Sequence, residues 1–363
     1  MKILKNITTT TMVMALLLVS SLEARETKKV SNFSGSNFVE SSGTFDGNRI
    51  YADVTNNGLF LDYHISGDSA LEWPKGTGVH SIFQSALWMG ATVNGQIRTI
   101  VGDYTQDMGP GPYGGDPLAA VHRIYKVNKS MLDDPASHDD FQNWPTDWGA
   151  PWVDADGDGV YTPLPAGPDH PEFIGDQVIW FVSNDGDIAY KLNFGTDPMG
   201  VEIQTTMFGY DRIDAIGDML FVKQLVINKG GDDLVDTYMG LWSDPDLGYA
   251  GDDFVGCNVD LGMGYVWNDG ADSQYDNLDI GTPAAGYDFF QGPKVPCDDP
   301  TDPVECPAQG AKMFGTYFPG EKNLQMSSFA FYINGDITYT DPADEVEGYY
   351  YLQGFRKDGS KYP

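Results

Sequence analysis

Apolar and polar positions alternate over short runs along this chain, and no run of ten residues after residue 24 keeps a helical period. Residues 82–93 and 96–101 are two apolar runs, and Asn94-Gly95 between them is the dipeptide most typical of a two-residue β-hairpin turn. Turn residues separate such runs at intervals of about 8–12 residues. The pattern predicts an all-β protein of β-sandwich or jelly-roll-like architecture, with long irregular loops rich in Asp, Gly and Pro.

A denser set of apolar runs follows residue 176. In residues 219–229 apolar side chains occupy both alternating faces, which predicts a strand in the centre of a sheet. Residues 347–361 predict a strand followed by a turn. The other runs expected to form strands are residues 119–127, 178–182, 188–194, 201–210 and 235–242.

The sequence divides into four segments. They are a signal peptide over residues 1–24, a flexible lead-in over 25–47, an N-terminal β region over 48–175 and a β-sandwich region over 176–363. The lead-in is rich in Ser, Gly and Asn, as flexible linkers are. Because the last residues offer neither a closing strand nor a sorting tail, the sequence looks like an N-terminal fragment of a longer protein.

The first 24 residues have the parts of a secretory signal. Lys2 and Lys5 precede the apolar residues 12–19, and small residues follow up to Ala24. The alternative is a membrane anchor, but the apolar stretch is far shorter than the roughly 20 residues that cross a bilayer. We therefore expect a secreted or cell-surface protein, with no membrane insertion after the signal is cleaved.

The charge of the chain excludes two classes of partner. The 363 residues include 53 acidic and 21 basic ones, which gives a formal net charge of −32. Such a field repels the phosphates of nucleic acids and the anionic surface of lipid bilayers. Of the acidic residues 43 are Asp, whose short carboxylate suits turns and is a common ligand of hard cations.

Residues 154–161, DADGDGVY, carry the clearest motif in the chain. Asp154, Asp156 and Asp158 stand at positions 1, 3 and 5 of an EF-hand-type loop, Gly159 at the sharp turn, and Val160 where a backbone carbonyl binds the ion. This spacing converges three carboxylates, whose mutual repulsion a cation would relieve. The motif predicts a calcium site.

The second half of the calcium-type pattern is missing. Pro165 stands where a bidentate Glu belongs, so a later carboxylate has to complete the shell, and Asp169 and Asp176 are the candidates. The alternative is a solvated Asp-Gly turn without an ion. A second acidic cluster, read either as a polar connection or as a further cation site, consists of Asp244, Asp246, Asp252 and Asp253.

Three cysteines stand in the second half of the chain. Cys297 and Cys306 bracket a polar, proline-containing loop, and in an oxidising compartment we expect a disulfide between them. Cys257 is then expected to be a buried thiol. The cysteines and histidines lack the spacing of a structural zinc site.

Trp144, Trp148 and Trp152 recur every four residues before the acidic loop. Exposed indole rings at this spacing would form a platform on which sugar rings stack. The other interpretation is that the rings fill the core beneath an irregular loop.

Catalytic motifs are mostly absent from the sequence. Neither HExxH nor GxSxG occurs, and the five histidines stand alone. Glycoside hydrolysis needs two carboxylates at a suitable separation, for which Glu172 and Glu202 are the candidates. We expect no hydrolysis of common polysaccharides or peptides.

Two stretches of the chain resemble a family of large secreted proteins of Bacteroidota and related bacteria, mostly uncharacterised. They are DADGDGVYTPLPAGPDHPEFIGDQVIWFVSNDGD and LWSDPDLGYAGDDFVGCNVDLGMGYVWNDG, the second followed by PAAGYDFFQGP. The resemblance covers roughly residues 50–360. It implies an exported protein, since members often carry fibronectin-like modules and a C-terminal sorting domain of the type IX secretion system.

These observations predict a secreted or cell-surface, calcium-stabilised β protein that acts in adhesion or in contact with glycans or other surface proteins. Two alternatives stay open. One is a secreted hydrolase or the accessory region of one, and the other is a purely structural module of a larger exported protein.

Overall fold

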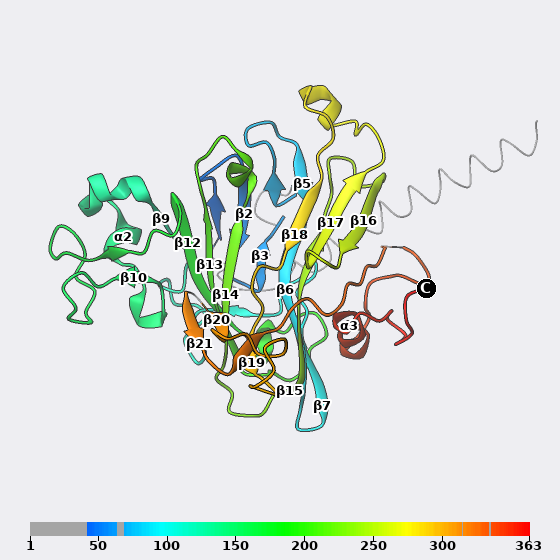
Figure 1. The fold of residues 1–363 in the computed structure, drawn as a ribbon. Helices are drawn as coiled ribbons and strands as arrows, with labels where there is room; N and C mark the ends of the chain where they lie inside the picture. Colours follow the sequence, from blue (N-terminus) through cyan, green and yellow to red (C-terminus); the bar gives the residue numbers. More distant parts are fainter. Residues whose placement is uncertain (1–41, 64–68, 314, 334) are drawn as a thin grey trace, which may run out of the picture. The chain divides into compact units, whose positions relative to one another are not determined.

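A computed structural model describes residues 42–63, 69–313, 315–333 and 335–363 of the chain (Figure 1). The expected signal peptide over residues 1–24, and the lead-in as far as residue 41, lie outside the described residues. Strands make up 35% and helices 11%, so the all-β class is confirmed. Within the described ranges, no helix combines the length and the apolar character needed to cross a membrane.

The chain folds into two units. The first contains the residues up to Asp244 together with Tyr332–Pro363, and the second contains Pro245–Phe331. The boundary expected at residues 175 and 176 falls inside the first unit, because strands on either side of it pair in one sheet. Among the described residues the strands are distributed over seven small antiparallel sheets, which is nearer to the separate sheets of a propeller than to a jelly roll.

The largest sheet of the first unit has the order β14-β13-β12-β8, with β9 also paired to β12. Strand β12 is buried over its whole length. In the order of strands, β12 and β13 occupy the middle of the sheet. The strands are β8 (Gly109–Pro110), β9 (Tyr125–Asn128), β12 (Gln177–Asn184), β13 (Val201–Gly209) and β14 (Phe221–Asn228).

A second large sheet has the order β15-β6-β3, with β7 paired to β6. Asn94 and Gly95 connect β6 to β7 and have φ angles of 51° and 80°, the left-handed values that a type I′ hairpin turn needs. The hairpin predicted from Asn94-Gly95 is therefore present. The strands are β3 (Leu59–Leu61), β6 (Gln84–Val93), β7 (Gln96–Ile100) and β15 (Val235–Asp244).

Smaller elements complete the first unit. β1 pairs with β2 from Ser42 onward, so the end of the lead-in expected over residues 25–47 is a strand. Its Phe45 is fully buried, which holds this end of the lead-in to the fold. The remaining elements are β1 (Ser42–Phe45), β2 (Tyr51–Thr55), β4 (Leu71–Glu72), β5 (His80–Ile82), β10 (Trp152–Val153), β11 (His170–Pro171), α2 (Asp139–Gln142), α3 (Glu345–Leu352) and five 3-10 helices: η1 (Lys129–Asp133), η2 (Pro135–Ser137), η3 (Thr146–Trp148), η4 (Ile188–Tyr190) and η5 (Ala215–Asp218).

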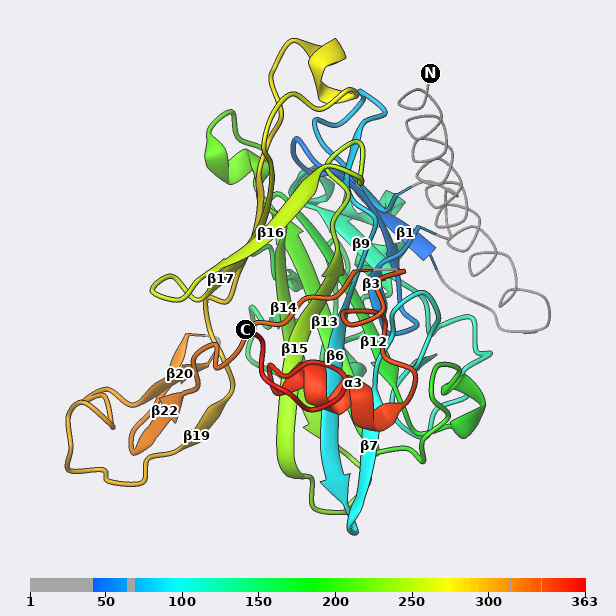
Figure 2. The ribbon, with the colours of Figure 1, turned by 90° about the vertical axis from the view of Figure 1, so that its right-hand side faces the viewer.

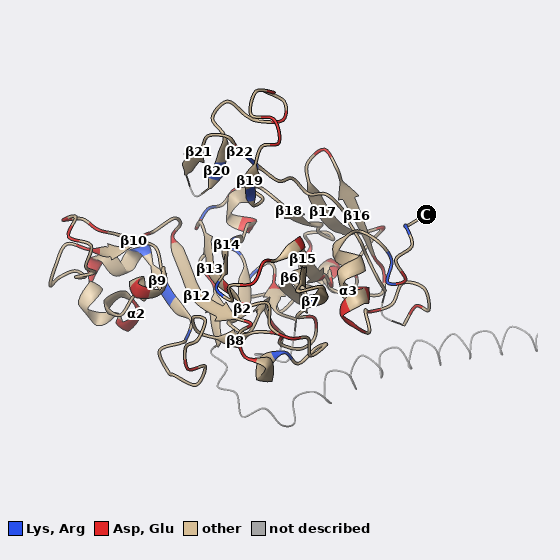
Figure 3. Cartoon of the chain, turned by 90° about the horizontal axis from the view of Figure 1, so that it is seen from below, with Lys and Arg blue, Asp and Glu red and all other residues tan. Residues whose placement is uncertain are grey.

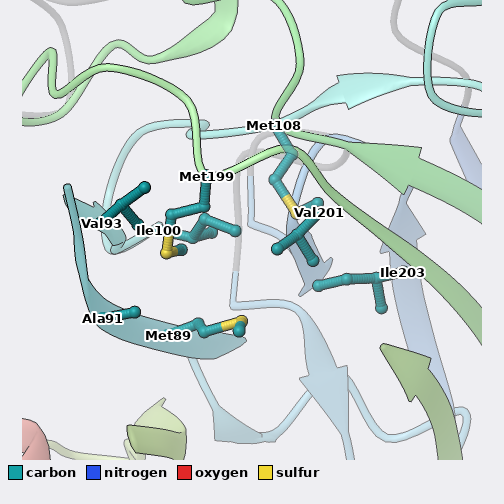
Figure 4. Close-up of a cluster of buried hydrophobic side chains, with 8 residues drawn as sticks. All are labelled: Met89, Ala91, Val93, Ile100, Met108, Met199, Val201 and Ile203. Carbon is teal, nitrogen blue, oxygen red and sulfur yellow. The ribbon is translucent and has the colours of Figure 1, made fainter. Parts of the chain in front are cut away.

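The central core of the first unit lies between its two large sheets (Figure 4). Met89 and Ala91 of β6 meet Val201 and Ile203 of β13 there, as alternate residues of each strand face inward. The cluster comprises Met89, Ala91, Val93, Ile100, Met108, Met199, Val201 and Ile203. The two sheets therefore pack face to face around one apolar core.

A second core lies under an irregular lobe, which we define as residues 129–176. Tyr125 and Val127 of β9 and Val178 and Trp180 of β12 form its sheet side. Phe141 of α2, fully buried, closes it from the lobe side. This packing fixes the lobe to the sheet.

Helix α3 replaces the strand expected over residues 347–361. Asp344 caps it by accepting hydrogen bonds from the backbone N–H groups of Val346 and Glu347, at 3.0 and 2.9 Å. The helix contacts β6, β7 and β15 (Figure 2). Gly90 of β6 admits the ring of Tyr349, because a Cβ at Gly90 would lie only 2.7 Å from it.

Two other expected strands differ in the structure. Residues 219–229 form β14, which lies at the edge of its sheet and not at the centre. Residues 188–194 form η4 and an irregular segment, because the side chain of Lys191 turns into the interior and Asp187 caps η4 through Ala189. The alternating pattern of residues 188–194 therefore does not correspond to a strand, because Lys191 is buried as an ion-pair partner.

The described part of the second unit contains three small sheets. Cys297 and Cys306 form a disulfide there, with their Cα atoms 5.6 Å apart, and Cys257 is a partly exposed free thiol, not a buried one. The elements are β16 (Asp253–Asn258), β17 (Met263–Asn268), η6 (Tyr275–Leu278), β18 (Ala285–Asp288), β19 (Lys294–Pro296), β20 (Ala311–Met313), β21 (Thr316–Phe318) and β22 (Glu321–Asn323).

Candidate metal centre

The acidic motif lies in the loop that joins β10 to β11. The two strands pair antiparallel, with Trp152 opposite Pro171 and Val153 opposite His170, which brings the ends of the loop together. Farther out, the backbone N–H of Asp169 donates to the carbonyl of Thr162. The residues between β10 and β11 are thereby closed in a compact loop. Figure 3 shows acidic residues in the connections around β10.

Short side chains shape the turns at the tip of the loop. The carboxylate of Asp154 accepts hydrogen bonds from the backbone N–H groups of Gly157 and Gly159, at 2.8 and 3.0 Å. Both glycines have left-handed φ angles, 77° and 75°, with open space where a Cβ would lie. Asp158 makes a similar turn by accepting from the N–H of Val160, at 2.8 Å.

Asp169 anchors the loop from below. Its side chain is fully buried, and its Oδ1 and Oδ2 accept hydrogen bonds from the N–H groups of Ala155 and Thr162, at 3.0 and 2.7 Å. These two residues stand on opposite arms of the loop. One buried carboxylate therefore joins both arms.

Three carboxylates converge at this point. Each of Asp154, Asp156 and Asp169 places an oxygen within 4.8 Å of the other two, and within the described ranges this is the one group of three or more such side chains. Asp154 and Asp156 are exposed, while Asp169 is buried. Desolvation, together with the negative charges of Asp158, Asp169 and Asp154, raises the pKa of Asp156 above its usual range. We call Asp154, Asp156 and Asp169 the acidic triad.

The triad differs from the predicted ligand set. Asp158 lies outside it, and Val160, which was expected to offer its carbonyl, has a side chain 62% exposed at the tip of the loop. Asp176 lies before β12, where its Oδ2 accepts from the N–H of Asp211 at 2.8 Å. Of the two carboxylates considered for completing the shell, Asp169 is the one beside the motif.

The loop is tied to the core beneath it by aromatic side chains. Trp152 and Tyr161 meet edge to face, with ring centroids 5.4 Å apart. The hydroxyl of Tyr161 donates to the carbonyl oxygen of Phe141 at 2.7 Å, and burial raises its pKa. Ordering the loop therefore also orders the packing of the lobe.

The tryptophans expected as a sugar-stacking platform belong to the lobe core. Trp144 is 3% exposed and donates its indole N–H to the carbonyl of Pro151. Trp148 packs edge-on against His122, and Trp152 packs against Tyr161. Trp144 is therefore buried, whereas Trp148 and Trp152 are partly buried and pack against the lobe core, so a stacking platform of all three rings stays a prediction.

The residues of the second acidic cluster belong to different units of the described chain. Asp244 accepts a hydrogen bond from the hydroxyl of Tyr104 at 3.0 Å, within the first unit. Asp253, in the second unit, accepts from the N–H of Leu247 at 2.9 Å, and burial raises its pKa to about 6. Within the described residues, Asp246 and Asp252 are not part of a group of three converging carboxylates.

The two glutamates considered for glycoside hydrolysis have different partners. Glu202 is buried in β13, where it accepts from the N–H of Tyr113 at 2.9 Å and from the amide of Gln204 at 3.0 Å. Glu172 is exposed beside β11, where its charge acts on Lys223. A small cavity between the sheets is lined by residues such as Leu87, Met108 and Ile203, none of them ionisable.

A buried ion cluster in the first unit was missed in the sequence. Lys191, Asp107 and Asp185 have side chains at most 2% exposed. The sequence contains one signal for this cluster, a single lysine inside residues 188–194, an apolar run that is typical of a strand.

Comparisons with known proteins give no relative. No family model, no curated protein and no solved structure matches the chain.

Proposed function

We propose that this protein is an exported β protein whose irregular lobe is held by a calcium ion at Asp154, Asp156 and Asp169, and that it acts by surface contact with glycans or other surface molecules. The observation that carries the proposal is the acidic triad. It combines two exposed carboxylates with one that is already buried and hydrogen-bonded.

The chemistry of the triad favours calcium among common cations. All three side chains supply oxygen, the ligand of hard cations, and neither imidazole nor thiolate takes part. Calcium takes about 6–8 oxygen ligands in flexible geometry, so carbonyls and water at the exposed tip can complete the shell. Magnesium demands a stricter octahedron and gives up its water reluctantly.

Binding at the triad would stabilise the lobe. Without a cation, the carboxylates of Asp154 and Asp156 repel the buried charge of Asp169 across a few ångströms. A ligand that binds only the folded state stabilises it by RT ln(1 + [L]/Kd), about 2.7 kcal/mol at a hundredfold excess over Kd. The exposed tip would then be fixed to the buried floor of the loop.

An aromatic row on the second unit supports the contact role. Phe254 on β16 lies opposite Trp267 on β17, and Tyr265 follows on the same face of β17. The rings of Phe254 and Trp267 stack at 5.8 Å, and Phe254 is 49% exposed. Such rings offer apolar faces to sugars.

The export signal expected at residues 1–24, the disulfide between Cys297 and Cys306 and the resemblance to large secreted proteins support a location outside the cell. Isothermal titration calorimetry of the full chain tests the ion directly. We expect one calcium bound per chain, with magnesium binding more weakly. Absence of a binding heat for calcium at millimolar concentration would remove the proposal.

A further inference from the structure

Lys191 is buried in the interior of the first unit between two carboxylates. Its Nζ lies 3.2 Å from Oδ2 of Asp107 and 3.9 Å from Oδ2 of Asp185. It also donates a hydrogen bond to the carbonyl oxygen of Thr99. The side chains of Lys191 and Asp185 are 0% exposed and that of Asp107 is 2% exposed.

The two carboxylates are supported unequally. Asp185 accepts two backbone hydrogen bonds, from Met199 and Val201, each at 2.7 Å and one on each carboxylate oxygen. Asp107 accepts one from Val101 at 2.9 Å, through Oδ2, and the backbone of Asn193 has a smaller effect on the same carboxylate. Among the described residues none donates to its other oxygen, Oδ1, which is buried.

One ammonium therefore faces two buried carboxylates, and Asp107 is the one suited to carry a proton. Burial raises the pKa of Asp107, against the opposing effect of Lys191. An uncharged carboxyl group costs less in a dry interior than a second carboxylate.

The surroundings of this cluster exclude water. Four apolar residues next to the cluster belong to the central core: Ile100, Met108, Met199 and Val201 (Figure 4). Met108 directly follows Asp107 in the chain, and Met199 and Val201 donate their backbone N–H groups to Asp185. An amine and a carboxyl group held in contact in such a place react as an intramolecular pair, without the entropic cost of encounter.

We infer that Nζ of Lys191 and Cγ of Asp107 become joined by an intramolecular amide bond. Lys191 gives one ammonium proton to Asp185, and the lone pair of Nζ then forms a bond to Cγ. A second proton from Nζ leaves with the hydroxyl of the protonated Asp107 carboxyl as water. The products are a secondary amide, one water and a protonated Asp185, which later releases its proton to solvent.

Each neighbour has a defined part in this step. Asp185, at 3.9 Å from Nζ, is the base that uncovers the amine. The N–H of Val101 on Oδ2 of Asp107 polarises the carbonyl that is attacked, as donors do at a developing oxyanion. Oδ1, which accepts nothing, is the oxygen that departs.

The bond would join residues 84 positions apart. Asp107 stands in the connection from β7 of one large sheet to β8 of the other, and Lys191 directly follows η4, so the cross-link would join this connection to the segment after β12. All three cysteines lie in the second unit, so the first unit has no means of forming a disulfide. An amide bond would give it covalent closure that reducing agents do not open.

Mass spectrometry of the denatured, mature full chain tests this inference. We expect a mass lower by one water than the sequence requires, and a branched peptide containing Lys191 and Asp107 after digestion. Lys191→Met should show the full sequence mass. Asp107→Asn should still close, by losing ammonia, and reach the same mass as the closed wild type.

Asp185→Asn separates a role in the reaction from a role in folding. It keeps one acceptor oxygen for the two backbone donors, which lowers stability, but it is no base. The fraction that folds should therefore carry the full, unclosed mass. A wild-type mass equal to that of the sequence, with Lys191 and Asp107 in separate unbranched peptides, would overturn the inference whatever the variants do.

Discussion

The carboxylates of Asp154 and Asp169 lie within 4.8 Å of each other although they stand at the two ends of the loop between β10 and β11. Asp154 shapes the exposed tip through Gly157 and Gly159, whereas Asp169 is the buried anchor. Two like charges held this close in a folded loop make a cation the natural third partner.

Replacing the anchor should destabilise the lobe even without a cation. In Asp169→Asn one carboxylate oxygen becomes an amide donor, so the N–H of either Ala155 or Thr162 loses its acceptor. We expect a loss of about 1–3 kcal/mol in the free energy of unfolding in chelator. Urea denaturation followed by tryptophan fluorescence measures it, with Asp158→Asn as the charge-matched control; equal stability of the two variants would contradict the anchor role.

The stability of the second unit should depend on Asp253 in a defined pH window. Burial raises the pKa of Asp253 from 3.8 to about 6, so its protonated form is favoured in the folded state. Its contribution to stability is fully present below pH 3.8 and is lost as the pH rises through about 6. Asp253→Asn, which stays uncharged, should lack this change.

The melting temperatures of the wild type and of Asp253→Asn across this pH range provide the measurement. The variant should gain on the wild type as the pH rises through the window. A difference between them that stays constant from pH 4 to pH 7, or one of the opposite sign, would show that Asp253 has an ordinary pKa.

The position of α3 should depend on the absence of a side chain at Gly90. A Cβ at this residue would lie 2.7 Å from Cδ2 of Tyr349, so Gly90→Ala must displace the helix. We expect a destabilisation of about 1–3 kcal/mol, typical of overpacking. Gly270→Ala, where a Cβ would meet open space, is the control in the same denaturation experiment; similar losses for both would argue against tight packing of α3.

The aromatic row of the second unit should carry glycan contact. Trp267→Ala removes the ring that stacks on Phe254 and also contacts Tyr265, and should weaken binding on a glycan array several-fold. Trp152→Ala, in the lobe core, should lower stability without selectively lowering binding. Glycan binding that survives Trp267→Ala would locate the contact elsewhere.

Much of the sheet structure follows from local sequence. Asn94-Gly95 fixes the β6–β7 hairpin because few residue pairs accept two left-handed φ angles. The uninterrupted apolar residues 178–182 produced β12, buried on both faces. Residues 219–229 suggested a central strand, but Lys223 and Gln224 interrupt the apolar pattern, and β14 lies at an edge.

Other features depend on partners remote in the sequence. Asp344 and the match between Tyr349 and Gly90 make residues 345–352 a helix, although their aromatic side chains favour strands. Two of the three residues of the acidic triad, Asp154 and Asp156, were predicted from their spacing. The choice of Asp169 over Asp176 was not, because the pairing of β10 with β11 decides which carboxylate reaches the loop.

Calcium-dependent stability of the full chain is the most direct test of the proposed function. The melting temperatures of the wild type, Asp156→Asn and Asp158→Asn in chelator and in millimolar calcium provide it. Both variants lose one charge and keep a turn acceptor, but only Asp156 belongs to the triad. We expect calcium to raise the melting temperature of the wild type and of Asp158→Asn by several degrees, and to leave Asp156→Asn nearly unchanged. Equal melting temperatures of the wild type with and without calcium would contradict the account.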